Sequence, residues 1–237
     1  MAEDDKIMLT ILMPCLNEEN TVGICIDRAK AFMLRNKIRG EVLIADNGST
    51  DRSYSIAKAH GARVIRVKRT GYGYALRAGL RASRGRIIIL GDCDTTYDFS
   101  DILKMYRPLY EGKCDLVIGN RIDGNIRPGA MPFTHKLGVR MLSALGRIRF
   151  KVKVRDFHCG LRGITKEAVE KMRFRTGGME FATEMIALAK RNELRIYEVP
   201  VVLHKCTYDR KSKLKTIRDG FRHVRYILKG YEKREDD

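Results

Sequence analysis

The sequence has no tryptophan, only five prolines, and six scattered cysteines without a Cys-x-x-Cys pair. This cysteine pattern argues against both a disulfide framework and a zinc site, and it fits a reducing cytosol. No apolar run approaches the ~20 residues that a membrane-spanning helix needs. Residues 1–6 are acidic and polar, so we expect neither a secretory signal nor a membrane span.

Acidic residues are few relative to basic ones: 29 Asp and Glu stand against 47 Lys and Arg, for a net charge of +18. This excess predicts an anionic partner, such as a nucleic acid, an anionic membrane surface or a phosphate-bearing substrate. No nucleic-acid-binding module is recognisable, so we expect no nucleic acid partner, although charge alone keeps a basic nucleic-acid-binding protein as an alternative. The 237 residues fit one large domain or two small ones.

Four consecutive apolar residues at 87–90 predict a strand that is buried on both faces, as in a parallel sheet under helices. Asp92 and Asp94 follow at the carboxyl end of this strand, where open α/β sheets bind ligands. Two carboxylates there suggest a site for Mg²⁺ or Mn²⁺ and a diphosphate. The alternative is a solvated loop with an Asx-turn.

The first half of the chain alternates strand and helix patterns, which predicts a mostly parallel, twisted sheet with helices on both faces. The second half is less regular, and Pro200 predicts an edge strand or a bulge. We expect strands at 7–13, 41–45, 63–67, 86–90, 115–119 and 195–203, and helices at 19–35, 51–60, 75–82, 101–111, 136–145, 166–172 and 180–191.

Polar clusters at 14–19 and 46–51 follow the first two predicted strands. Each cluster alone is explained by helix capping. Together with Asp92 and Asp94 they place three acidic clusters on one edge of the sheet, which capping does not require. The glycine segment 71–75 matches a dinucleotide fingerprint poorly, since Leu76 stands where the third glycine belongs. We interpret it as a glycine turn entering a helix whose small residues, Ala75 and Gly79, pack closely on the sheet.

A set of eight motifs occurs in one order along nearly the whole chain. The motifs are Pro14-x-x-Asn17-Glu18, Asp46-Asn47-Gly48-Ser49-x-Asp51, Gly71-x-Gly73-x-Ala75-x-x-x-Gly79, Asp92-x-Asp94, Gly119-Asn120-Arg121, Asp156-x-x-Cys159-Gly160-Leu161-Arg162, Glu198-Val199-Pro200 and Ser212-Lys213-Leu214. This set resembles glycosyltransferase family 2, in the branch of dolichyl-phosphate mannose and dolichyl-phosphate glucose synthases.

The resemblance implies an A-type glycosyltransferase fold, a nucleotide-diphosphate-sugar donor, Mg²⁺ or Mn²⁺, and a polyprenyl phosphate acceptor. Asp92 and Asp94 would hold the metal and, with Arg121, form the catalytic set. The predicted donor-binding residues are Pro14, Leu16, Asn17, Glu18, Asp46, Asn47, Gly48, Lys68, Gly73, Asp92, Cys93 and Asp94. The predicted acceptor-phosphate residues are Arg121, His135, Arg140, Arg162, Lys205, Arg210 and Lys213.

Two departures from the family pattern affect the expected donor. Mannose synthases of this type often carry Gln where this chain has Thr96, and Gly where it has Lys211. We therefore favour UDP-glucose or UDP-N-acetylglucosamine, with GDP-mannose as the alternative. The family also implies inversion at the anomeric carbon. A sugar-phosphate nucleotidyltransferase, which releases diphosphate from a nucleoside triphosphate, is a further alternative with similar metal carboxylates.

We divide the chain into a catalytic domain at 1–212, with a nucleotide-binding half at 1–120 and an acceptor half at 121–212, and a C-terminal helix at 213–237. Apolar residues with helical spacing alternate there with basic ones, which predicts a helix on an anionic membrane surface. The alternative is a helix that packs its apolar face on the domain. We expect residues 205–213 to form a loop over the donor, and the protein to be cytoplasmic and peripheral at the cytoplasmic face of the membrane. The sequence predicts no oligomeric state.

Overall fold

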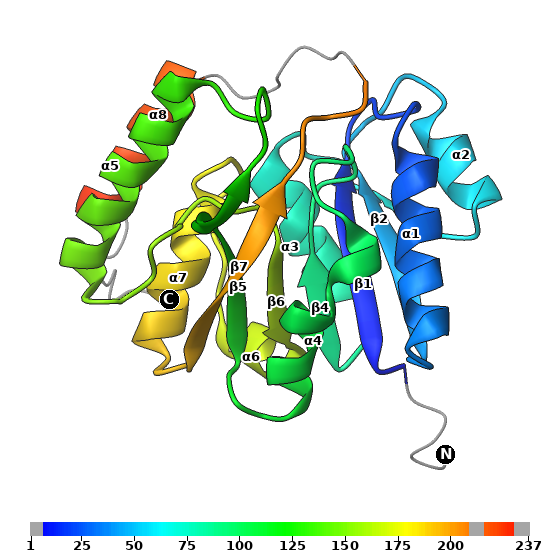
Figure 1. The fold of residues 1–237 in the computed structure, drawn as a ribbon, viewed down its shortest axis with the longest axis horizontal. Coiled ribbons are helices and arrows are strands. Elements are labelled where there is room, and N and C mark those ends of the chain that lie inside the picture. The colour runs from blue at the N-terminus through cyan, green and yellow to red at the C-terminus, as the bar shows by residue number, and fades with distance from the viewer. Residues whose placement is uncertain (1–6, 209–215, 230–237) are drawn as a thin grey trace.

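The computed structural model describes residues 7–208 and 216–229 and shows a seven-stranded sheet in the order β3-β2-β1-β4-β6-β5-β7 (Figure 1). All neighbouring strands are parallel except β6, which runs antiparallel to both β4 and β5. This arrangement confirms the predicted α/β class and the mostly parallel sheet. The strands are β1 (Leu9–Cys15), β2 (Gly40–Asp46), β3 (Arg63–Arg66), β4 (Ile87–Leu90), β5 (Leu116–Ile126), β6 (Arg162–Thr165) and β7 (Ile196–Leu203).

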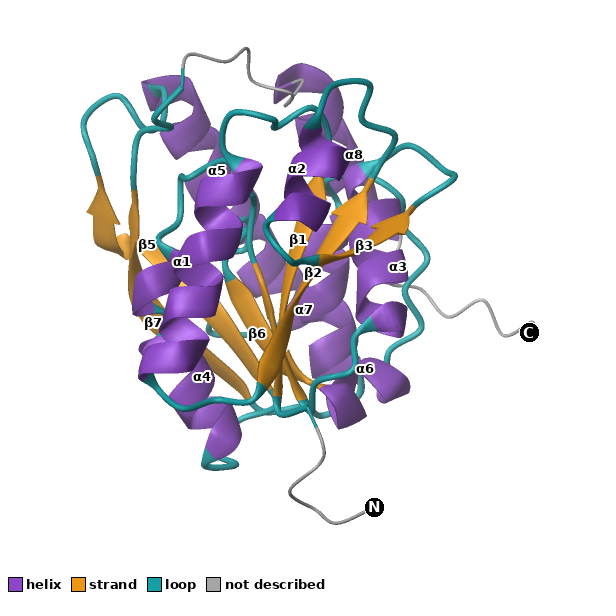
Figure 2. Ribbon diagram, turned by 90° about the vertical axis from the view of Figure 1, so that its right-hand side faces the viewer, coloured by secondary structure: helices purple, strands orange, loops and turns teal. Residues whose placement is uncertain are grey.

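Helices cover both faces of the sheet, as predicted (Figure 2). One face carries α1 (Val22–Arg35), α2 (Ser53–Ala59), the 3₁₀ turn η2 (Phe99–Asp101) and α4 (Leu103–Tyr110). The other carries α3 (Tyr72–Ala82), α6 (Lys166–Lys171) and α7 (Phe181–Arg191), and α5 (Phe133–Phe150) lies side by side with α8 (Thr216–Lys229) outside α7. None of the helices in the described ranges is both long and apolar enough to cross a membrane.

The core is built around the two central strands. All four residues of β4 are buried, as the apolar run at 87–90 predicts, and β1 is buried along nearly its whole length. Helix α3 lies close against β1 because Gly79 carries no side chain: a Cβ at that position would overlap Leu12. The expectation that the small residues of this helix permit close packing is therefore confirmed.

Strand β7 ends the sheet, so the prediction that Pro200 lies on an edge strand is confirmed. Its partner β5 is also irregular: the pairing passes from Asn120 opposite Pro200 to Asn125 opposite Val202. Residues 121–124 thus leave the regular ladder, as expected of a bulge that re-aims a side chain. Strand β6 was not predicted, because Arg162 and Gly163 break the apolar pattern of this short strand.

The direction of β6 decides which loops meet. The carboxyl ends of β1, β2 and β4 lie at one edge of the sheet, where ligands of open α/β folds bind. Because β6 is antiparallel to β4, it starts at this edge, with Arg162 opposite Leu90. The loop before β6, rather than the loop after it, therefore reaches the same edge.

Candidate active site

A cleft of about 570 Å³, which we call the main cleft, lies at the carboxyl ends of the central strands. Its walls come from the segments after β1 and β4, the start of α3, the loop at 177–179, and α8. Asp92 and Asp94 both line it. The two carboxylates thus lie in a concave site, as the metal–diphosphate hypothesis requires, rather than on an open surface.

The carboxylates are held in different ways. Asp94 is buried, and its Oδ1 accepts hydrogen bonds from the backbone N of Thr96 at 3.0 Å and from the Thr96 hydroxyl at 2.5 Å. This is the predicted Asx-turn, so the turn and the cleft position occur together. Asp92 interacts with the hydroxyl of Tyr72. Burial raises the pKa of that hydroxyl well above its usual range and the Asp92 charge raises it further, so the phenol stays protonated.

Side-chain hydrogen bonds fix the loops after β1 and β2. They do not cap the helices that follow, because the N-cap residues of α1 and α2 are Thr21 and Arg52 and neither helix has a side-chain capping bond, so the capping explanation of the polar clusters is wrong. Asn17 Oδ1 accepts a hydrogen bond from Thr50 N at 2.8 Å, and the backbone N of Asn17 donates to Ser49 Oγ at 3.0 Å. Asp51 accepts from Glu19 N at 3.1 Å and from Ser53 N at 2.9 Å. The bonds of Asn17 and Glu19 join the loop after β1 to the loop after β2.

Asn47 fastens the third wall of the cleft. Its side chain donates to the Arg69 carbonyl at 2.8 Å and accepts from Gly71 N at 2.7 Å. Gly71 and Gly73 in turn let α3 approach the loop at 176–178: a Cβ on Gly73 would lie 2.8 Å from the Thr176 carbonyl oxygen. The glycine turn is thus a close-packing device, consistent with our interpretation of this segment.

Seven of the predicted donor residues line the main cleft: Pro14, Leu16, Glu18, Asn47, Asp92, Cys93 and Asp94. Five lie outside the lining: Asn17, Asp46, Gly48, Lys68 and Gly73. Asn17 and Gly73 serve the loops described above. Asp46 is buried and accepts from Ser49 N at 3.2 Å, whereas Gly48 and Lys68 are exposed.

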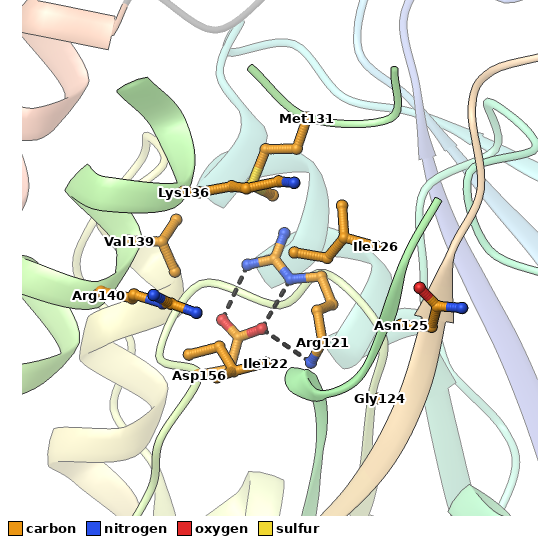
Figure 3. A pocket seen from close by; sticks show the side chains of 10 residues that line it. All are labelled: Arg121, Ile122, Gly124, Asn125, Ile126, Met131, Lys136, Val139, Arg140 and Asp156. Atoms are coloured by element: carbon orange, nitrogen blue, oxygen red, sulfur yellow. Dashed lines mark hydrogen bonds and ion pairs between the residues drawn. The ribbon is translucent and has the colours of Figure 1, made fainter. Parts of the chain in front are cut away.

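A second cavity of about 240 Å³, the cationic pocket, lies between β5 and α5 (Figure 3). Arg121, Lys136 and Arg140 line it together with the apolar side chains of Ile122, Ile126, Met131 and Val139. Arg121 is fixed by Asp156, which accepts from its Nε at 2.7 Å, its Nη2 at 2.8 Å and its backbone N at 3.1 Å. The pocket therefore offers positive charge and apolar surface side by side.

The Arg121–Asp156 pair is buried, with the Asp156 side chain 0% and the Arg121 side chain 8% exposed. Burial raises the pKa of Asp156, but the hydrogen bonds and charge of Arg121 outweigh it and hold that pKa below its usual range. Asp156 engages Nε and Nη2 of Arg121, so Nη1 is the part of the guanidinium that can reach a ligand.

The structure brings together only part of the predicted acceptor set. Arg121 and Arg140 share the cationic pocket, whereas His135 and Lys205 lie outside its lining. Arg162 is buried, and its guanidinium donates to the carbonyls of Phe157, Cys159 and Ala182. We therefore correct its expected role from phosphate contact to loop support. Arg210 and Lys213 lie outside the described residues, as does most of the predicted donor-covering loop.

Sequence reasoning missed Lys136, which lies one helical turn before Arg140 on α5. That i, i+4 spacing was the available signal, because residues four apart share a helix face. It also missed Tyr72 and the loop at 177–179, which carry no charge pattern. These residues line the cleft only because of the way α3 and α7 pack.

A third cavity of about 160 Å³, the inner chamber, shares lining residues with each of the other two. It shares Tyr72, Asp92 and Met179 with the main cleft and Arg121 with the cationic pocket. The three cavities therefore form a row that has the carboxylates at one end and the cations at the other.

Helix α8 forms part of the main cleft. Arg222 Nη2 pairs with Glu180 Oε1 at 2.6 Å, and Arg218, Asp219 and Arg222 line the cleft. On the other side of the helix, His223 Nδ1 lies 2.8 Å from the Thr183 hydroxyl, and Ile227 is fully buried. The helix thus packs on the domain, as the alternative to a purely membrane-facing helix states.

Comparison with known proteins places these features in a family. Residues 10–173 match the family described as glycosyl transferase family 2. The chain is 39% identical over 221 residues to the low-salt glycan biosynthesis hexosyltransferase Agl6 of Haloferax volcanii, covering 93% of this chain and 53% of that protein. It is 33% identical over 168 residues to the dodecaprenyl-phosphate galacturonate synthase of Rhizobium johnstonii, covering 66% of this chain and 47% of that protein. The chain thus spans about half the length of these two relatives.

The fold is shared with solved structures. Glucosyl-3-phosphoglycerate synthase from Mycobacterium tuberculosis, in complex with Mn²⁺ and UDP-glucose, superposes with a TM-score of 0.75 at 23% identity. The match covers 94% of this chain and 78% of that one. This likeness confirms the predicted A-type glycosyltransferase fold. Because the family match covers more than half of its length, the chain belongs to glycosyl transferase family 2.

Proposed function

We propose that this chain transfers a hexose from a nucleotide-diphosphate sugar to a polyprenyl phosphate. The row of three cavities carries the proposal. Asp92 and Asp94 lie at one end, Arg121, Lys136 and Arg140 at the other, and apolar side chains stand beside the cations. A donor diphosphate with its cation suits the first end, and the phosphate of a lipid suits the second.

The carboxylate end fits a divalent cation. Mg²⁺ and Mn²⁺ prefer hard oxygen ligands, and such ions are commonly held by one or two carboxylates with substrate phosphates and water completing the shell. Asp92 and Asp94 supply those two carboxylates. The described parts of the chain contain no cluster of three or more candidate protein ligands, so phosphate oxygens and water would complete the shell. When bound, the cation would stabilise the negative charge that develops on the leaving diphosphate.

The reaction is a single displacement at the anomeric carbon. An oxygen of the acceptor phosphate forms the new bond to this carbon while the bond to the donor's β-phosphate oxygen breaks, and the electron pair leaves with the nucleoside diphosphate. Attack opposite the leaving group inverts the configuration. A phosphate monoester is largely ionised at pH 7, with a second pKa near ~6, so it needs no strong general base. It needs positive charge to hold it, which Arg121, Lys136 and Arg140 provide.

For the donor we keep UDP-glucose or UDP-N-acetylglucosamine ahead of GDP-mannose. The Thr96 hydroxyl donates to Asp94 and Thr96 lines the inner chamber, so the residue that departs from the mannose-type pattern would lie beside both the metal and the sugar of the donor. The mycobacterial neighbour with Mn²⁺ and UDP-glucose and the rhizobial dodecaprenyl-phosphate relative support the donor and acceptor classes respectively.

An exposed apolar stripe supports docking at a membrane. Large apolar side chains on the outer side of α5 and α8 are between 51% and 78% exposed: Phe133, Leu137, Met141, Ile148, Phe221 and Leu228. Helix α5 contains basic but no acidic side chains. The charge beside the exposed apolar side chains therefore favours an anionic bilayer over a second copy of this basic chain. All six cysteines are free, which fits a reducing compartment. We therefore propose a peripheral protein at the cytoplasmic face.

Radiolabelled transfer from each of the three donors to a short-chain polyprenyl phosphate tests the proposal. Lys136→Ala and Arg140→Ala should each lower kcat/KM for the acceptor roughly 10- to 150-fold, because a hydrogen bond to a charged group contributes about 1.5–3 kcal/mol. Arg147→Ala, on the same helix but outside the pocket lining, is the matched control. Release of diphosphate from a nucleoside triphosphate, without lipid glycosylation, would instead identify a nucleotidyltransferase.

Sedimentation with anionic liposomes tests the docking surface separately. Leu137→Ser with Met141→Ser should weaken binding, whereas Leu34→Ser, at an exposed position on α1, should not. No loss in either variant would mean that binding follows overall charge rather than the α5–α8 stripe.

A further inference from the structure

His158 is a side chain with unused hydrogen-bonding capacity in the inner chamber. Within the described residues, neither its Nδ1 nor its Nε2 has a hydrogen-bond partner, and both atoms are buried. Buried polar atoms are rarely left unpaired, because each costs about 1–3 kcal/mol, so an exception of this kind calls for an explanation.

The ring is held firmly in this state. His223 meets it edge to face, with ring centroids 4.4 Å apart and planes at 84°. Phe157 lies on another side, with centroids 6.4 Å apart. Burial lowers the pKa of His158 well below its usual range, and the charges of Arg121 and Arg162 lower it further. The imidazole is therefore neutral, and offers one N–H donor and one nitrogen acceptor.

Other polar groups in the inner chamber already have partners. The Tyr97 hydroxyl accepts a hydrogen bond from Gly160 N at 3.1 Å, and the Arg162 guanidinium donates to three carbonyls. The Thr96 hydroxyl donates to Asp94. His158 is thus the lining residue whose two polar atoms call for a ligand of matching chemistry.

The position of the chamber indicates which ligand His158 would bind. In the proposed function, on which this step rests, the anomeric carbon lies between the diphosphate at Asp92 and the acceptor phosphate at Arg121. The chamber borders both of these residues, so it is the cavity in which the sugar ring would lie. We infer that His158 is a specificity-determining residue that hydrogen-bonds the hydroxyl groups of the donor's hexose, as a donor to one oxygen and an acceptor from another.

Binding of nucleotide sugar and of free nucleotide, measured by calorimetry with Mn²⁺, tests this role. His158→Phe keeps a ring against His223 and removes both nitrogens. We expect it to weaken the binding of UDP-glucose (or of GDP-mannose, if that is the donor bound) about tenfold or more. Binding of the matching UDP or GDP should change less than twofold, because a nucleotide without its sugar does not reach the chamber. His60→Phe, at a surface histidine paired with Asp27, is the control.

Two further measurements separate this role from a structural one. The free His158→Phe protein should be no less stable than the wild type in thermal unfolding, because the wild type leaves both nitrogens unpaired. Because His158 is proposed to bond two hydroxyl groups, a singly deoxygenated donor that lacks either of them should show a smaller difference in affinity between wild type and variant than the intact donor, and at least one such donor should do so.

Equal loss of nucleotide-sugar and nucleotide binding, or no loss of either, would overturn the assignment. The readout needs no acceptor, so it stays decisive if transfer to polyprenyl phosphate fails. Failure of the wild type to bind any of the three nucleotide sugars would overturn both proposals together.

Discussion

The buried pair of Arg121 and Asp156 has a surface counterpart with nearly the same geometry, and comparing the two isolates the effect of burial. Asp156 holds Arg121 through bonds of 2.7, 2.8 and 3.1 Å. Asp115 holds Arg195 through bonds of 2.8, 2.9 and 3.1 Å. The arginine side chain is 8% exposed in the first pair and 59% in the second.

Asp156→Asn should destabilise the protein by about 3–5 kcal/mol, because it leaves the buried Arg121 charge without its partner. Asp115→Asn should cost about 0–1 kcal/mol, since water solvates an exposed arginine. For a domain of this size, 1 kcal/mol shifts Tm by about 2–4 °C, so the expected loss for Asp156→Asn is roughly 6–20 °C. Thermal unfolding followed by circular dichroism measures both variants.

The pH dependence supplies an independent check with a definite sign. The pKa of Asp156 is lower in the folded protein than in the unfolded chain. Its stabilisation is therefore fully present above the unfolded value near ~3.9 and disappears as the pH falls through the folded value. The difference in the free energy of unfolding between wild type and Asp156→Asn should stay constant from pH 7 to 5 and shrink below about pH 4. Equal melting of the two asparagine variants, or a gap that widens in acid, would refute the reasoning.

Three further predictions follow from single contacts. Gly160→Ala should lower transfer more than tenfold with little change in Tm, because its Cβ would lie 2.7 Å from Asp92 Oδ2 and displace the carboxylate; unchanged kcat would contradict this. Burial lowers the pKa of His223 to about 4, so between pH 6.5 and 4 the unfolded chain binds a proton that the folded chain does not, and stability should fall with acidification over this window. His223→Asn should flatten that fall, as a pH series of urea unfolding curves would show. Asp94→Ala should abolish transfer while the protein stays folded, and excess chelator should do the same to the wild type; turnover that persists in chelator would exclude a role for the cation.

The fold was largely predictable because its signals are local. The fully apolar run of β4 and the regular alternation of strands and helices in the first half depend only on neighbouring residues. Strand β6 escaped prediction because its four residues, Arg162–Thr165, carry no apolar pattern and gain their structure from pairing with β4 and β5. Tertiary pairing there overrides local preference.

The site was predictable only where a residue's chemistry is visible in sequence. Asp92, Asp94 and Arg121 can be singled out in the sequence by their charge and by their position after a predicted strand. His158 and Arg222 do not, because their importance depends on which other elements they face. Arg162 misled in the opposite direction, since a buried arginine that bonds three carbonyls cannot be told from a phosphate-binding one by sequence alone.

The reversed strand β6 also bears on how the chain reaches its native state during synthesis. Strand β4 ends at Leu90, and the strand that covers its far side ends at Thr165, about 75 residues later. At translation rates of about 5–20 residues per second, this side remains open for roughly 4–15 s. An open edge of four apolar residues is a template for association with another chain. Nascent chains paused before residue 162 should therefore be the species of this protein most prone to aggregate.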